Sequence, residues 1–127
     1  MKFPRPSEGA IARLKAALPA EGVTLKPMFG QVGMFVNGNM AGGTWGETVT
    51  LRLSPEDRLD LEDLGGTVFD PMGGRPMREF RLLPVELVED AETLQTWVRR
   101  AIRATAALPP AEPKKEKKKT DKKKAGS

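Results

Sequence analysis

The chain has 127 residues and a formal net charge of +4, and it contains no cysteine, histidine or tyrosine. Those absences exclude disulfides, thiolate and imidazole metal sites, cysteine nucleophiles and every catalytic triad that uses histidine as its base. The length and the 39% hydrophobic content fit one globular domain with a modest core.

The N-terminal residues MKFPRPSEGA are polar and interrupted by proline, so they lack the apolar segment of a signal peptide. No apolar run approaches the length of a membrane span. We therefore expect a cytoplasmic protein. The first predicted helix starts after Ser7, a favourable N-cap, carries Ile11, Leu14 and Leu18 on one face, and ends at Pro19.

Residues 23–53 change to short apolar runs separated by turn residues, a pattern typical of an antiparallel meander. Asn37-Gly38 predicts a type I′ hairpin turn, because both central residues of that turn need positive φ. Gly46 marks the next turn. In the last run, Val49, Leu51 and Leu53 alternate with polar residues, so we expect one face of that strand in the core and the other polar.

The glycine-rich stretch 28–46 could alternatively be a phosphate-binding loop. Its glycines lack the spacing of a dinucleotide-binding fingerprint, and in the nearest approach to a P-loop Thr44 stands where the lysine is required. No helix is expected after it to hold the anion. We therefore interpret the glycines as turns, bulges and close-packing positions and predict no cofactor.

A short helix is predicted from Ser54, with Pro55 at its first position, to the stop at Gly65-Gly66. Two further strands follow at 67–69 and 78–83, which brings the sheet to about six strands. In the second of these strands Phe80 and Leu82 are predicted to face the core, whereas Glu79 and Arg81 face water.

Asp90 is the predicted cap of a last helix with an apolar stripe, in which Trp97 is expected to be a core anchor. Residues 1–108 are predicted to form the domain, and 109–127 a disordered tail that has no large apolar residue to bury. Eight lysines and three carboxylates give residues 111–127 a net charge of +5, which leaves −1 for the residues before them.

Carboxylates cluster at residues 56–63 and 86–92, but at helix starts and on amphipathic faces, where solvated charge is the ordinary explanation. We predict neither catalytic residues nor a metal site. Arg75, on a glycine-rich loop, is a candidate partner contact, or alternatively an ion-pair partner of Asp70 or of an acidic helix. Trp45 is a candidate partner contact or a core residue. Most of the numerous methionines are expected to fill the core.

The lysine tail is either a solubilising appendage or an electrostatic arm. It has no aromatic residues between its lysines to stack on bases and no arginine to read them, so any nucleic-acid binding would be directed to phosphates and sensitive to salt. The candidate contacts are Lys114, Lys115, Lys117, Lys118, Lys119, Lys122, Lys123 and Lys124.

Several segments of the chain form one combined pattern. They are Met28-Phe29-Gly30, the residues from Gly33 to Ala41, Leu51-Arg52-Leu53, Gly73-Gly74-Arg75-Pro76-Met77, Pro84, and Glu92, Leu94, Trp97, Val98 and Ala101 in the last helix. Together these segments resemble the N-terminal domain of the TfoX/Sxy family. The resemblance spans about residues 5 to 108. It departs from the family pattern at Gln31 and Gly42, and a lysine tail stands in place of the second domain of the full-length regulators.

The resemblance implies an α+β fold of two layers, an antiparallel sheet of about five to six strands with flanking N- and C-terminal helices, similar to secretion chaperones. It implies no enzymatic activity. The named members of the family regulate natural competence together with a transcription factor of the cyclic-AMP receptor type. The leading hypothesis is a regulator that contacts a protein, such as a transcription factor or an RNA polymerase complex. The alternative is a non-specific DNA-binding protein that uses the tail, and a carboxylate enzyme is the least favoured. A homodimer is compatible with either hypothesis.

Overall fold

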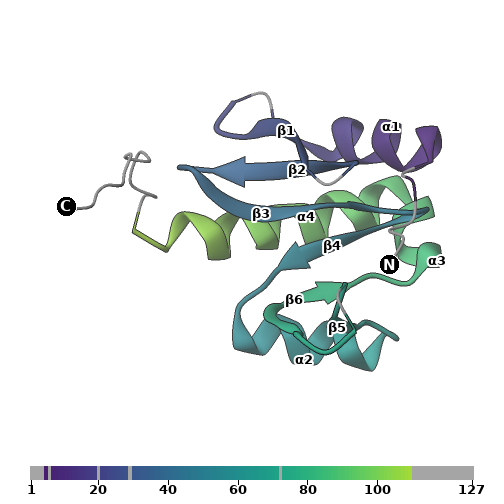
Figure 1. Cartoon of the computed structure of the whole chain (residues 1–127), viewed down its shortest axis with the longest axis vertical. Helices are drawn as coiled ribbons and strands as arrows, with labels where there is room; N and C mark the ends of the chain where they lie inside the picture. Colours follow the sequence, from purple (N-terminus) through teal and green to yellow (C-terminus); the bar gives the residue numbers. More distant parts are fainter. Residues whose placement is uncertain (1–4, 6, 20, 29, 72, 110–127) are drawn as a thin grey trace.

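Six antiparallel strands form a single sheet in the order β1-β2-β3-β4-β6-β5 (Figure 1). The computed structural model describes residues 5, 7–19, 21–28, 30–71 and 73–109. Along the chain the elements are α1 (Glu8–Ala17), β1 (Thr24–Met28), β2 (Gln31–Val36), β3 (Asn39–Trp45), β4 (Thr48–Arg52), α2 (Pro55–Asp63), β5 (Thr67–Phe69), β6 (Met77–Leu82), α3 (Val85–Glu89) and α4 (Ala91–Ala106).

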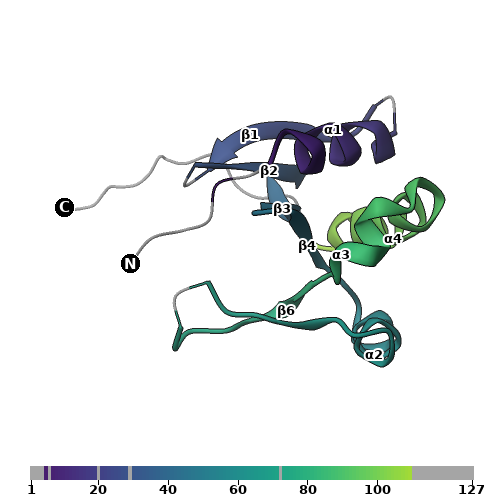
Figure 2. The same ribbon diagram turned by 90° about the vertical axis from the view of Figure 1, so that its right-hand side faces the viewer.

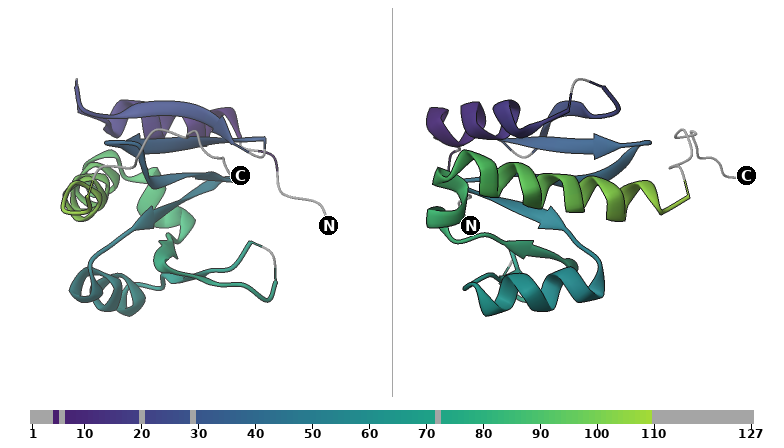
Figure 3. Two further views of the ribbon diagram at one scale, coloured as in Figure 1. Left: turned by 60° about the vertical axis from the view of Figure 1, so that its left-hand side comes forward. Right: turned by 180° about the vertical axis from the view of Figure 1, so that it is seen from behind.

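The described helices cover one face of this sheet, and none of them lies on the other face. In Figure 2, α1, α4 and α2 lie on the same side of the sheet. From behind, α4 lies in front of the strands, and α2 lies near β6 (Figure 3). The predicted α+β architecture is therefore confirmed, and within the described residues one side of the sheet carries no helix.

The helix starts follow from their capping residues. Ser7 Oγ accepts a hydrogen bond from the Ala10 amide at 2.9 Å, and Ser54 Oγ accepts one from the Asp57 amide at 3.2 Å. The Asp90 carboxylate accepts bonds from the first amides of α4. Each cap satisfies amides that a helix start leaves without a backbone partner. The three predicted helices are confirmed, whereas α3, only five residues long, was not predicted.

The glycine-rich stretch folds into β2, β3 and their turns. Asn37 and Gly38 have φ of 53° and 82°, which confirms the predicted hairpin turn. Gly42 is required for a different reason. A Cβ on Gly42 would lie 2.4 Å from the carbonyl oxygen of Thr50 on the neighbouring strand, so the two backbones approach too closely for any side chain. The interpretation of these glycines as turns and close approaches is confirmed.

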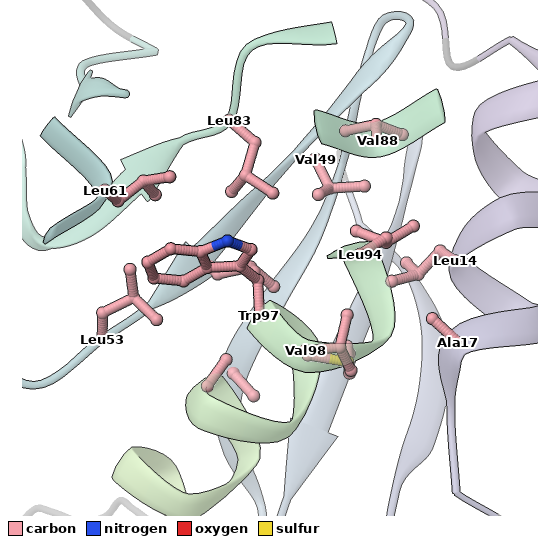
Figure 4. Close-up of a cluster of buried hydrophobic side chains, with 14 of the residues drawn as sticks. Leu14, Ala17, Val49, Leu53, Leu61, Leu83, Val88, Leu94, Trp97 and Val98 are labelled. Atoms are coloured by element: carbon pink, nitrogen blue, oxygen red, sulfur yellow. The ribbon is translucent and has the colours of Figure 1, made fainter. Parts of the chain in front are cut away.

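The main core lies between the sheet and the helices (Figure 4). Trp97 projects from α4 toward β4 and is 5% exposed, so it is the core anchor that the sequence predicts. The labelled residues around it are Leu14, Ala17, Val49, Leu53, Leu61, Leu83, Val88, Leu94 and Val98. Among the methionines, Met34 is buried in this core, but Met40 and Met77 are half-exposed.

The prediction that Arg81 faces water was wrong. Arg81 pairs in register with the core residue Leu51 and is therefore on the helix side, where its guanidinium binds Glu62 of α2. Phe80 is buried, as predicted, but on the opposite face, in register with Arg52. Thr50, on the face of β4 that was predicted to be polar, is 1% exposed. The face away from the described helices therefore also buries side chains.

Candidate interaction surface

The helix-free face of the sheet is defined by strand alternation. Met34 and Leu51 are buried toward the helices, so their neighbours Phe35 and Arg52 lie on the other side. Cross-strand register extends this assignment to the remaining strands. We call the resulting surface the open face, and it includes Thr24, Lys26, Gly33, Phe35, Met40, Gly43, Trp45, Thr48, Thr50, Arg52, Thr67, Phe69, Phe80 and Leu82.

Trp45 and Phe69 meet across this face. The two ring centroids are 5.0 Å apart and the rings lie edge to face at 83°. Their strands, β3 and β5, are separated by β4 and β6 in the sheet order. Three strand spacings in a flat sheet amount to about 14 Å, so the sheet must curl strongly toward the open face to bring the rings together. Trp45 is thus packed against another ring and also half-exposed. It therefore has features of both predicted alternatives, a core residue and a surface residue that a partner could contact.

The curled part of the open face encloses a small second core. Phe69 and Phe80 are 5% and 3% exposed, although neither is in the main core. The hydroxyls of the two buried threonines are satisfied, because Thr48 donates to the Leu83 carbonyl and Thr50 to the Arg81 carbonyl. Satisfied polar groups of this kind belong to the folded interior, so this half of the open face is largely structural.

Arg52 ties three strands together on the same face. Its Nε donates to the Met40 carbonyl of β3 at 2.8 Å, and its guanidinium carbon lies 4.7 Å from the ring centroid of Phe80 on β6. Its Nη1 also forms an ion pair with Glu79. With these partners on both sides of β4, Arg52 stabilises the curvature of the sheet and is not available to a ligand.

The β1–β2–β3 half of the open face is more accessible. Phe35 on β2 and Met40 on β3 are partners in the strand register, and both are half-exposed. Lys26 Nζ on β1 lies 5.3 Å from the centroid of the Phe35 ring, a cation–π distance. Beside them Gly33 and Gly43, both buried, face each other across the two strands. This half therefore combines half-exposed apolar side chains with a cation.

The loop that carries Arg75 projects on the side of the sheet away from the helices (Figure 2). It begins directly after Phe69, the ring on which Trp45 packs. The Asp70 carboxylate accepts hydrogen bonds from the amides of Gly74 and Arg75, at 3.1 and 3.2 Å. Asp70 thus binds the backbone of Arg75, and within the described residues the exposed guanidinium has no ion-pair partner. The alternative of an ion pair between the two side chains is therefore wrong.

Three carboxylates of α2, those of Asp57, Asp60 and Glu62, are partners of arginines. Arg81 Nε lies 2.6 Å from Glu62 Oε2. Arg100, whose guanidinium also lies 4.6 Å from the Trp97 ring centroid, is 3.4 Å from Asp57 and 3.8 Å from Asp60. Sequence reasoning missed these pairs, because nothing in the sequence indicates that α2 lies beside β6 and α4. The cluster holds elements together.

A small hollow of about 290 Å³ lies between α1 and the junction of α3 with α4. Its polar groups include Arg13, Glu89 and Glu92, all exposed. In the described part of the chain, no group of three or more histidine, cysteine, aspartate or glutamate side chains is placed to hold a metal ion. Over the same residues, no helix is both long and apolar enough to cross a membrane.

The candidate tail contacts, Lys114 to Lys124, lie outside the described residues. Pro109, the last residue that the structure describes, has a defined contact. Asn39 Nδ2 donates to the Pro109 carbonyl at 2.8 Å, so the chain leaves α4 and arrives at the β2–β3 hairpin. Asn39 is in register with the core residue Val36, so this contact lies on the helix side of the hairpin, and not on the open face.

Comparison with known protein families identifies a domain family for this chain. A family model described as the TfoX N-terminal domain matches residues 16–105, which is more than two thirds of the chain. No curated protein and no solved structure matches the chain. The matched residues include Phe35, Trp45 and Arg75 and end before the lysine tail.

Proposed function

The chain belongs to the TfoX N-terminal domain family, and from this premise we propose that it is a cytoplasmic, non-enzymatic binding module that takes part in transcription by contacting another protein. A transcription factor or an RNA polymerase complex is the proposed partner, as the family resemblance implies. Asp57, Asp60 and Glu62 of α2 support a non-enzymatic role, because arginines occupy these carboxylates in structural ion pairs.

The observation that carries this proposal is a pair of candidate contact residues that are connected through Phe69. Trp45 packs on Phe69, and the loop that starts after Phe69 presents an exposed arginine, Arg75, with no ion-pair partner among the described residues. Tryptophan and arginine are the residue types most enriched at energetic hot spots of protein interfaces. A half-exposed aromatic ring and an exposed cation suit a partner surface that offers an apolar patch and an acidic group.

Affinity capture with nuclease-treated lysate tests the proposal, using the full chain and a chain that lacks residues 111–127. Both should recover the same protein, and Arg75→Ala should reduce its recovery. Arg99→Ala is the matched control, since Arg99 is an exposed arginine on α4, among the helices. A capture that recovers no specific protein, or recovery that Arg75→Ala leaves unchanged, would contradict the proposal.

A second candidate function is non-specific nucleic-acid binding through the lysine tail. The hydrogen bond from Asn39 to Pro109 favours it, because it anchors the start of a segment of net charge +5 on the folded domain. Such binding neutralises phosphates and weakens steeply as salt rises. Deletion of residues 111–127 should abolish it, whereas binding that survives the deletion would contradict a tail-based mechanism.

A further inference from the structure

Among the described residues, the exposed large apolar side chains all belong to one short segment of the chain, from α2 to β5. They are Leu59, Leu64 and Val68, with exposed fractions of 64%, 53% and 44%. Both elements lie at the end of the sheet opposite α1 and β1 (Figure 1). Single apolar side chains scattered over a surface need no explanation, but a group of them with a polar rim marks an interaction site. We propose that this surface binds a segment of another protein that carries an aliphatic anchor between basic residues.

Leu59 and Val68 lie on either side of one ion pair. Glu62 is one helical turn after Leu59, so the two side chains are neighbours on the surface of α2. The Glu62 carboxylate binds the Arg81 guanidinium, with Oε2 and Nε 2.6 Å apart. Arg81 in turn is the cross-strand partner of Val68 on β5. We call these four residues the α2–β5 surface. It lies on the helix side of the sheet, whereas Trp45 lies on the open face.

The charges around the α2–β5 surface specify a basic partner. Glu56 and Asp63, one turn before and one turn after Leu59, are exposed and form no ion pair within the described residues. The arginine of the ion pair is neutralised by its glutamate, and Arg58 directs its Nε to a backbone carbonyl. Over the nine residues of α2, five carboxylates stand against one arginine. Unpaired carboxylates beside exposed apolar side chains therefore complement lysine or arginine next to an aliphatic residue.

The outer edge of β5 adds a second means of binding such a segment. Within the described residues β5 pairs only with β6, so its other side offers backbone groups to an incoming strand. The opposite edge strand, β1, carries Pro27 and Lys26, two residue types that hinder strand addition. In contrast, β5 carries neither a proline nor a charged residue. The backbone of the partner segment can therefore pair along β5.

A second copy of this chain fits the same surface less well. Pairing of two β5 strands would bring the carboxylates of two α2 helices together, and their like charges disfavour that arrangement. A basic segment of another protein meets no such repulsion. The charge of α2 therefore selects between two occupants that the exposed apolar side chains alone would accept.

Nuclear magnetic resonance of the isotope-labelled full chain tests the proposal with two short synthetic peptides. One peptide alternates lysine with leucine, and the other has glutamate in place of each lysine. The lysine peptide should shift the amide signals of α2 and β5, including those of Leu59 and Val68, whereas the glutamate peptide should leave them unchanged. A response of these signals to both peptides, or to neither, would overturn the proposal.

Substitutions on α2 separate the apolar contact from the charges. Leu59→Ser changes a largely exposed side chain, so the fold is retained, and it should weaken binding of the lysine peptide by about three-fold or more. Glu56→Gln combined with Asp63→Asn should weaken it by about three-fold or more. Glu89→Gln combined with Glu92→Gln is the matched control, because it removes two exposed carboxylates from α3 and α4. Equal losses in the two double variants would overturn the proposal, since the peptide would then respond to overall charge.

Analytical ultracentrifugation of the full chain tests the competing occupant. Wild-type protein should show no association that depends on the α2–β5 surface. Dimerisation that rises with protein concentration and that Val68→Ser abolishes would overturn the basic partner, because a second copy would then occupy this surface.

Discussion

Trp45 on β3 packs its ring edge to face against Phe69 on β5, with centroids 5.0 Å apart, across the width of two intervening strands. This contact has two consequences. It closes a second small core on the sheet face that no helix covers, and it fixes the point from which the Arg75 loop departs. Fold and candidate site are therefore coupled, because the residues that curl the sheet also position the exposed arginine.

The Trp45–Phe69 contact should appear as a coupling free energy. Trp45→Leu and Phe69→Leu are each expected to lower the free energy of unfolding, but the double variant should lose less than the sum of the two. An edge-to-face pair contributes about 0.5–1.5 kcal/mol beyond its burial, which sets the expected coupling. Urea unfolding of the four proteins measures it. Additive losses would mean that the rings pack independently.

Gly42 should not tolerate even a methyl group. In Gly42→Ala the new Cβ would lie 2.4 Å from the Thr50 carbonyl oxygen and 2.8 Å from Leu51 Cδ2, so two strands must separate. We expect a loss of about 1–3 kcal/mol in unfolding free energy. Gly74→Ala is the matched control, because nothing lies within 4 Å of its added Cβ, and it should change stability by less than about 0.5 kcal/mol.

The sequence was sufficient to predict elements whose signals are local. Ser7, Ser54 and Asp90 cap helices as predicted, and Asn37-Gly38 forms the predicted turn, because capping and positive φ depend only on neighbouring residues. Local signals did not indicate which face of β6 lies under the helices. Strand alternation shows that Phe80 and Arg81 lie on opposite faces of the sheet, but it does not show which of these faces lies against the helices. Burial does not decide this either, because both faces of the sheet bury side chains.

The candidate site was predictable in part for a similar reason. Trp45 and Arg75 stood out by residue type and by their glycine-rich surroundings. Their relation through Phe69 depends on the curl of the sheet, which no local pattern encodes. The pairing of the α2 carboxylates with Arg81 and Arg100 likewise follows from tertiary packing.

Arg52 should contribute more to stability than an exposed arginine. Arg52→Leu removes the bond to the Met40 carbonyl and the contact with the Phe80 ring, and it leaves Glu79 without its partner. We expect a loss of about 1–3 kcal/mol in chemical unfolding. Arg99→Leu, at an exposed position of α4, should be nearly neutral. Comparable effects of the two substitutions would show that Arg52 does not tie the strands together.

Asp70 should influence partner capture through the backbone of the Arg75 loop. Asp70→Ala removes the acceptor for the Gly74 and Arg75 amides, so the loop should lose its defined shape and recovery of the partner should fall, although Arg75 is intact. Asp70→Asn keeps an acceptor oxygen and should retain most of the recovery. If Asp70→Asn loses as much recovery as Asp70→Ala, the charge of Asp70 determines capture. If neither variant loses recovery, the shape of the loop does not matter for capture.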